Sequence, residues 1–583
     1  MHTGTSEQHK DLRPSTLTKD DKDLDKFCQW LLVHPPFAGY QQDRLVSLST
    51  GVVADATVNC DDAINVGHAA AAKITGKGFT DIKLHRSDKV KTMSDKDNTI
   101  AVRGKDTVVN PNLFFNRINC VLSRSSDLQE FFTYELAPQP PSLFSDGMMR
   151  KPTKSALGSL LKSFVTQQSH TPDKSIFVVD GGHLLQTVIW SQPAKYSDIC
   201  QSYVSYTLRH FGIGTTVVFD GYGTNSTKVA EQRRRAMKQT SSDIIFDENM
   251  QTTTTQTAFL ANSSNKKRLI SMLSEKMREA GIYVKQAEAD ADAMIVATVL
   301  SLAESQELPV TLVGTDTDLL VMLVAQTNPS ASVYMLCRSS PTTIYNINEI
   351  QESIGTTSQH LMFIHAITGC DTVSAIYRQG KRKAFNVVHK NQDDELVNIM
   401  QTFEKAGSTN HEVQNAGESF ILRLYGASNY KSLNDYRHIA YRRAISRSSL
   451  NSSFLLASLP PTSAAAKQHA YRCYLTIQDW KGNQLPPTKW GWKLLDGVLM
   501  PVATDLPVAP DSLLNMVSCG CKPDGCGLQC GCRKLGLFCS VLCSKCNGQT
   551  CNNTMQLSHD NIPEEESAEF DPLLLETVDD SDD

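Results

Sequence analysis

Two stretches, Ser175–Asp180 (SIFVVD) and Thr215–Asp220 (TTVVFD), decide the fold, because each is a short β-branched and aromatic run that ends in an aspartate. A third stretch, Pro309–Asp316 (PVTLVGTD), has the same form. Such runs are typical of strands buried on both faces of a parallel sheet. Helical patterns lie between them, including Lys266–Ala280 and Asp290–Leu302. This alternation predicts an α/β fold, with a parallel sheet core flanked by helices.

The rest of the chain divides by composition. At 583 residues it is long enough for three or four domains of about 150 residues each. The predicted order is a disordered segment (1–25), an N-terminal domain of unknown role (26–137), a Pro- and Ser-rich linker (138–174), the α/β domain (175–405), a helical and mixed extension (406–515), a small cysteine-rich module (516–553) and a disordered acidic tail (554–583).

Charge and hydropathy exclude some classes of protein. The hydrophobic fraction of 40% is enough to form hydrophobic cores. The sequence contains no run of 18 apolar residues, so a membrane-spanning helix is not expected. The net charge is 57 − 62 = −5, but residues 554–583 contain eleven acidic residues and no Lys or Arg. Without this tail the balance is 57 − 51 = +6, so the folded part is mildly basic. The tail could dock a protein partner, although acidic tails more often only solvate the chain.

Carboxylates recur where the predicted strands end. In open α/β sheets, ligands bind beyond the carboxyl ends of the strands, and carboxylates crowded there repel one another unless divalent cations lie among them. Mg²⁺ and Mn²⁺ prefer such oxygen ligands, and two ions can together activate water and clamp a phosphate. An aspartate that ends a strand is, however, commonly only a helix cap. The candidate metal ligands and catalytic residues are Asp180, Asp220, Glu288, Asp290, Asp316, Asp318 and Asp371.

This ordered set resembles the flap endonuclease/XPG-like 5′-nuclease family, a branch of the PIN-like fold, over residues 175–405. The similar blocks are FVVDGGHLL around Asp180, VVFDGYG around Asp220, AGIYVKQAEADADAMIV, VGTDTDLLVML and ITGCDTVSAI around Asp371. The resemblance implies a nuclease that uses two Mg²⁺ or Mn²⁺ ions held by the seven carboxylates. It departs from the family in that about 175 residues precede the first strand.

Two basic segments extend this resemblance to nucleic-acid binding. One resembles the family's arch, and the other, after Asp371, resembles the start of its helix–two-turn–helix, although Arg378 stands where the family's first turn glycine is expected. A solvated basic helix end is the alternative for the second segment. The predicted phosphate contacts are Lys228, Arg233, Arg234, Arg235, Lys238, Lys381, Arg382 and Lys383.

Nine of the sixteen cysteines fall within 33 residues, which indicates metal ligands rather than disulfides. Three tetrahedral zinc ions need twelve coordination positions, and six terminal plus three bridging thiolates supply them. The spacing resembles a CXC (tesmin-type) zinc domain that binds DNA, but Gln529 replaces the expected aromatic residue. A purely structural pre-SET-type cluster is the alternative. The predicted ligands are Cys519, Cys521, Cys526, Cys530, Cys532, Cys539, Cys543, Cys546 and Cys551.

Together these features predict a metal-dependent nuclease with a zinc module that binds DNA. A non-catalytic DNA-binding or chromatin-associated protein on a degenerate nuclease fold is the alternative, and an RNA substrate is a third. The cysteine-rich module and the expected DNA substrate predict a reducing, nuclear location.

Overall fold

The computed structural model describes the chain in segments. The described residues are 14–33, 45, 54, 58–78, 88, 90–92, 99–102, 105–108, 114–115, 117–118, 128–145, 147–165, 172, 174–221, 242–288, 290–338, 342–391, 393–447, 455–495, 498–521, 526–540, 542–543, 546, 548 and 551–553. They form two compact units, and the smaller one contains the described residues of the ranges 101–107 and 511–553.

A six-stranded sheet organises the larger unit, in the order β10-β9-β8-β5-β6-β7. Within this sheet, strands β5 to β9 are parallel to one another, and β10 runs antiparallel to β9. This confirms the predicted α/β class. The strands are β5 (Ile176–Asp180), β6 (Thr216–Phe219), β7 (Tyr283–Gln286), β8 (Val310–Val313), β9 (Val333–Cys337) and β10 (Thr343–Asn346).

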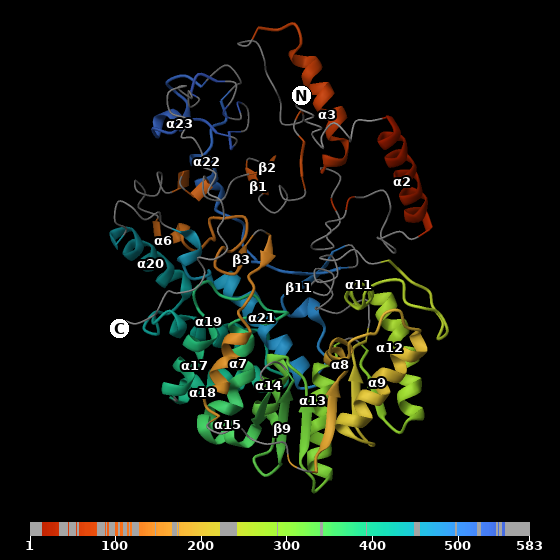
Figure 1. Cartoon of the computed structure of the whole chain (residues 1–583). Helices are drawn as coiled ribbons and strands as arrows, with labels where there is room; N and C mark the ends of the chain where they lie inside the picture. The colour runs from red at the N-terminus through yellow and green to blue at the C-terminus, as the bar shows by residue number, and fades with distance from the viewer. Residues whose placement is uncertain are drawn as a thin grey trace, which may run out of the picture. The chain divides into compact units, whose positions relative to one another are not determined.

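Alternate residues of the central strands enter two separate cores, as the two-residue period of a strand requires. Val179 of β5 packs into one core, and its neighbour Val178 packs into the other. In Figure 1 helices α9 and α12 lie side by side, while α13 and α14 lie nearer the middle of the sheet. The core of Val179 is closed by α8 (Gly181–Thr187), α9 (Tyr196–Phe211), α11 (Gln256–Ala261) and α12 (Ser263–Glu279); the core of Val178 is closed by α13 (Asp292–Ser305), α14 (Thr317–Gln326), α15 (Ile347–Ile354) and α16 (Leu361–Ile367).

The segment predicted as a linker is instead part of the core of Val178. Residues 138–165 carry strands β3 (Phe144–Ser145) and β4 (Met148–Met149) and helix α7 (Ser155–Lys162). Leu143, Leu157 and Leu161 are fully buried in that core. The linker prediction is therefore wrong for these residues. The Pro and Ser content suggested a linker, but the segment also contains the short amphipathic helix α7, whose leucines are buried.

The predicted C-terminal extension joins the same core. Helices α19 (Asn410–Leu424) and α21 (Ser463–Trp480) contact each other closely. Both also contact α18 (Asp394–Glu404), and α21 contacts α16. Buried Tyr474 and Trp480 of α21 belong to the core that contains Val178. The elements from residue 381 on are α17 (Lys381–Lys390), α18 (Asp394–Glu404), α19 (Asn410–Leu424), α20 (Leu433–Arg447), η5 (Leu456–Ser458), α21 (Ser463–Trp480), η6 (Pro487–Lys489), β11 (Trp492–Leu495) and β12 (Val498–Pro501).

The N-terminal region contains short elements. Residues 14–25, expected to be disordered, begin helix α2 (Pro14–Val33). The others are η1 (Cys60–Asp62), α3 (Ala63–Ile74), β1 (Thr99–Val102), β2 (Lys105–Val108) and α6 (Leu128–Phe131). The predicted acidic tail, 554–583, lies outside the described residues.

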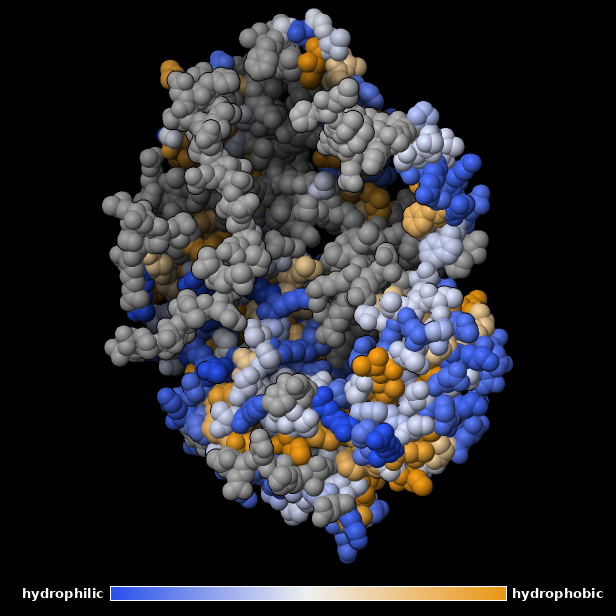
Figure 2. Space-filling model, viewed as in Figure 1, coloured by the Kyte–Doolittle hydropathy of each residue, from blue (hydrophilic) through white to orange (hydrophobic). Residues whose placement is uncertain are grey.

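Hydrophilic side chains cover most of the visible surface over α9 and α12, with scattered apolar residues among them (Figure 2). The smaller unit contains α22 (Asp511–Met516) and α23 (Gly531–Lys534). Within the described part of the chain, no helix has the length and apolar character needed to cross a membrane.

Candidate active site: a carboxylate cluster at the sheet edge

Asp180 is the last residue of β5, and Asp220 directly follows β6. Because these neighbouring strands are parallel, the two aspartates lie at the same edge of the sheet. Asp180 ends β5 and caps helix α8, where its Oδ1 accepts hydrogen bonds from Gly182 N at 2.8 Å and His183 N at 3.3 Å. A Cβ atom at Gly182 would stand 3.2 Å from Asp180 Oδ1 and 3.6 Å from Asp220 Oδ2. Both carboxylates therefore face the same small volume.

The order of the strands explains why this volume forms. The chain continues from β5 to β6 on one side, whereas β8 lies on the other side of β5. Such a reversal opens a crevice beyond the carboxyl ends of the strands. Asp316 follows β8 and caps helix α14, with its Oδ1 accepting from Asp318 N at 3.1 Å. Asp180 and Asp316 are thus helix caps and cluster members at once, so the two interpretations of these residues are not exclusive.

Asp292 joins the cluster, although the sequence analysis did not select it. It is the first residue of α13, and one carboxylate oxygen each from Asp292, Asp316 and Asp318 lie within 4.8 Å of one another. Asp220 positions this helix, because its Oδ1 accepts a hydrogen bond from Ala291 N at 3.2 Å. Three oxygens at this spacing fit a hard divalent cation.

Asp318 and Asp371 are joined by a lysine from the upstream segment. The Lys154 Nζ lies 2.9 Å from Asp318 Oδ2 and 2.8 Å from Asp371 Oδ2. Burial alone would lower the pKa of Lys154, but the negative charges of Asp318, Asp316 and Asp371 raise it above its usual value. Lys154 is therefore charged, and sequence reasoning missed it because it lies in the supposed linker.

Behind this ion pair lies a fully buried histidine. The Nε2 of His365, on α16, is 2.8 Å from Asp318 Oδ1. Burial and the nearby Lys381 lower the pKa of His365 to about 4, so the ring is neutral and Nε2–H donates to Asp318. This bond holds Asp318 through Oδ1, while Lys154 contacts Oδ2.

The electrostatics of the remaining carboxylates indicate a shortage of positive charge. Burial, with the charges of Asp220 and Asp292, raises the pKa of Asp180 to about 7. Burial, with the charge of Asp318, raises the pKa of Asp316 to about 6, although Lys154 opposes this. A bound cation would relieve the same repulsion, so the donor set fits a divalent ion.

Glu288 and Asp290 are less closely tied to the cluster. The Glu288 side chain is exposed, and Asp290 is half-buried. The backbone of Glu288 lies against Gly221, where a Cβ would stand 2.3 Å from the Glu288 carbonyl carbon. This close approach requires a glycine after Asp220.

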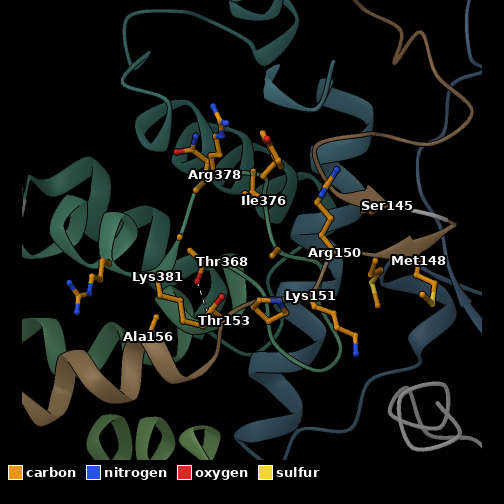
Figure 3. A pocket seen from close by; sticks show the side chains of 17 residues that line it. Ser145, Met148, Arg150, Lys151, Thr153, Ala156, Thr368, Ile376, Arg378 and Lys381 are labelled. Carbon is orange, nitrogen blue, oxygen red and sulfur yellow. Dashed lines mark hydrogen bonds between the residues drawn. The ribbon is translucent and has the colours of Figure 1, made fainter. Parts of the chain in front are cut away.

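A basic pocket of about 640 Å³ lies next to the cluster (Figure 3). It is formed by Ser145, residues 148–153 and Ala156 on one side and by Thr368 and residues 375–382 on the other. Arg150, Lys151, Arg378 and Arg382 contribute positive charge to it. The backbone joins the two walls, since Ala375 N donates to Arg150 O at 2.8 Å.

Lys381 differs from the other predicted phosphate contacts. It is only 3% exposed, and its Nζ donates to His365 O at 3.0 Å and to Gly369 O at 2.6 Å, with Thr368 Oγ1 at 3.3 Å (Figure 3). Its ammonium therefore caps the end of α16 rather than facing a ligand, and burial lowers its pKa to about 8. The prediction that Lys381 contacts phosphate is corrected accordingly.

Its neighbours Arg382 and Lys383 are exposed on the first turn of α17. Arg378 stands where the resemblance led us to expect a turn glycine. Its φ of 55° is the left-handed conformation that glycine adopts most readily, so the arginine takes the backbone conformation expected of that glycine. The other predicted contacts, Lys228, Arg233, Arg234, Arg235 and Lys238, lie outside the described residues.

In the smaller unit the nine cysteine thiols gather in one cluster. All nine belong to at least one of four overlapping groups of four whose sulfur atoms lie within 4.8 Å of one another. The Sγ atoms of Cys519 and Cys526 are 3.7 Å apart, and those of Cys532 and Cys543 are 3.5 Å apart. Tetrahedral zinc with Zn–S bonds of about 2.3 Å places its sulfurs roughly 3.8 Å apart. None of the described cysteines forms a disulfide, so the thiols fit zinc.

The overlap of these groups indicates shared ligands. Cys519 and Cys539 each belong to three groups, and Cys526, Cys530 and Cys546 each belong to two. Asn553 supports the cluster, because its Nδ2 donates to Leu537 O at 2.9 Å and lies 3.5 Å from Cys539 Sγ.

Comparisons with known proteins add three findings. A family described as a domain of unknown function (DUF8702) matches residues 1–135. No curated protein matches the chain.

Among solved structures, T5 5′-exonuclease with divalent zinc ions is 14% identical, with a TM-score of 0.26, over 53% of this chain and 99% of its own. A bacteriophage T5 flap endonuclease in a pseudo-enzyme–product complex with DNA and metal ions is 13% identical, with a TM-score of 0.26, over 53% and 100%. The catalytic core of Rad2 in complex with DNA substrate is 12% identical, with a TM-score of 0.28, over 56% and 97%. At such scores, function must be inferred from the carboxylates themselves.

Proposed function

We propose that this protein is a metal-dependent nuclease that cleaves phosphodiesters, with DNA as its substrate. The convergence of Asp180, Asp220, Asp292 and Asp316 at the switch point of a parallel sheet carries this proposal. A divalent cation, when bound there, would supply Lewis-acid charge to a phosphate and activate water. The chain's own carboxylates would hold and orient that ion, and the adjacent basic pocket would hold the phosphate backbone of the substrate.

The cysteine module would hold three zinc ions and contact DNA. Cys519 and Cys539, which each belong to three groups of four thiols, are proposed bridging ligands, and the third is one of Cys526, Cys530 and Cys546, which each belong to two. The absence of an aromatic at Gln529 supports backbone contact with little sequence preference. A reducing, nuclear location is part of this proposal, because thiolate ligands must stay unoxidised.

A second function is favoured by one observation. Lys154 already neutralises part of the cluster through Asp318 and Asp371, which would suit a non-catalytic DNA-binding protein on a nuclease fold.

The two functions are separated by incubating the zinc-loaded full chain with Mg²⁺ or Mn²⁺ and labelled flap, nicked, single-stranded and RNA substrates. We expect cleavage by the wild type and none by Asp316→Asn, which keeps the cap acceptor of α14 but removes the charge. Equal cleavage by both proteins would show that the activity arises elsewhere. Binding without cleavage by the wild type would favour the second function.

A further inference from the structure

The upstream segment places a permanent cation inside the carboxylate cluster. The Lys154 ammonium bridges Asp318 Oδ2 at 2.9 Å and Asp371 Oδ2 at 2.8 Å, and only 21% of the side chain is exposed. These two aspartates come from segments 53 residues apart in the chain, since 371 − 318 = 53. One ammonium therefore joins the α14 end of the cluster to the loop that follows α16.

The position of Lys154 is fixed on both sides. Helix α7 begins at the next residue, and its Leu157 and Leu161 are fully buried. Gly158 packs so closely on α14 that a Cβ there would stand 3.3 Å from Thr317 Oγ1, between the two cluster aspartates. Upstream, Arg150 O accepts the hydrogen bond from Ala375 N. The backbone on both sides of Lys154 is therefore held in place by contacts with the core and with the segment that contains Ala375.

The cluster consequently has two halves with different charge. In the first half, Asp318 uses Oδ1 for His365 and Oδ2 for Lys154, and Asp371 shares the same ammonium. In the second half, Asp180, Asp220, Asp292 and Asp316 converge, and one oxygen of Asp318 also lies within 4.8 Å of oxygens of Asp292 and Asp316. The Lys266 Nζ lies 3.9 Å from Asp220 Oδ2 in this half. The ammonium bridge therefore lies in the first half, and the oxygens of Asp292, Asp316 and Asp318 are spaced for an added ion beside it.

We propose that Lys154 takes the place of a second divalent ion, so that the centre binds one exchangeable divalent cation, in the half formed by Asp180, Asp220, Asp292 and Asp316. This revises the two-ion expectation from the sequence. The proposal rests on the proposed function only in that the cluster binds a divalent cation; it does not require cleavage.

The direct test counts Mn²⁺ in the zinc-loaded full chain by electron paramagnetic resonance. Sites outside the cluster are subtracted with Asp316→Asn. We expect one Mn²⁺ with the spectrum of an isolated ion. Two ions a few ångströms apart would be spin-coupled, and a coupled pair in the wild type would overturn the proposal without any variant having to fold.

Removing the ammonium should open the second position. In Lys154→Met, which keeps most of the side-chain length, we expect a second Mn²⁺ that binds at least about a hundredfold more tightly than any second ion of the wild type, because the repulsion between adjacent cations is lost. Lys162→Met, at the other end of α7, is the matched control and should keep one ion. A single ion in a folded Lys154→Met protein would contradict the proposal. Absence of Mn²⁺ from the cluster in both proteins would refute the proposed function as well.

Discussion

The carboxylate cluster and the cysteine cluster both gather negative charge, but they are held together differently. The carboxylates stand on a sheet between two apolar cores, so their positions are set before any ion binds. Seven of the nine cysteines are themselves the buried core of their segment, with Cys521, Cys551 and Leu537 packed against them. We therefore expect the first site to keep its shape without an ion, and the second to depend on metal ions for folding.

Zinc removal should therefore produce the largest effect, and in one unit only. Structural zinc contributes roughly 10–16 kcal/mol of apparent folding free energy in small domains. We expect a strong chelator to release three zinc ions per chain and to make residues 511–553 sensitive to protease, while the α/β core keeps its melting temperature. Release of two ions, with one thiol open to alkylation beforehand, would rule out the bridged cluster.

Loss of one carboxylate should abolish chemistry without unfolding the core. We expect Asp180→Asn to lower cleavage at least about a thousandfold, or ~4 kcal/mol in the transition state. The amide oxygen still caps α8, so nucleic-acid affinity and folding should be kept. The measurements are single-turnover cleavage and binding by fluorescence anisotropy. An active Asp180→Asn would remove this residue from the proposed centre.

The first turn of α17 contains both a buried lysine, Lys381, and an exposed arginine, Arg382. Lys381→Met would leave the carbonyls of His365 and Gly369 without their donor, and we expect a loss of about 2–4 kcal/mol in the stability of the larger unit. Arg382→Met, at the exposed next residue, is the control and should change stability by less than about 0.5 kcal/mol. Thermal denaturation of both variants decides the matter; equal melting temperatures would show that the capping interaction contributes nothing.

Much of this organisation follows from the sequence, because strand ends are local features. The runs ending at Asp180, Asp220 and Asp316 predicted β5, β6 and β8, and these aspartates do occupy one edge of the sheet. Strand β7, by contrast, has exposed Tyr283 and lies at the sheet edge, so its residues lack the apolar run that marks a central strand. It was missed for that reason.

The missed site residues depend on contacts between distant segments. Lys154 and His365 meet Asp318 across 164 and 47 residues, and no local pattern reports such contacts. Asp292 was within the quoted acidic block, but its selection over Glu288 depends on where α13 begins. Lys381 was misassigned because a basic helix start has the same sequence whether its lysine faces solvent or caps another helix.

The pH dependence of stability should separate the two halves of the carboxylate cluster. Because the folded pKa of Asp180 is raised to about 7, the native protein holds a proton that the unfolded chain loses near pH 4. Without divalent ions, stability should therefore fall as pH rises from about 4 to about 7, by at most ~1.4 kcal/mol per pH unit for this group. Asp180→Asn should flatten this fall, and a parallel pH profile in wild type and variant would contradict the assignment.

The smallest expected effect concerns the basic pocket beside the cluster. Arg382 is exposed on the first turn of α17 and lines the pocket, so Arg382→Met should remove one phosphate contact. The slope of log affinity against log salt should then decrease by about 0.7–0.9, with little change in cleavage at saturating substrate. Arg209→Met, at the exposed end of α9, is the matched control and should leave the slope unchanged. Anisotropy titrations at several salt concentrations measure both slopes. Equal slopes for Arg382→Met and the wild type would show that bound nucleic acid does not pass over this pocket, while leaving the carboxylate centre intact.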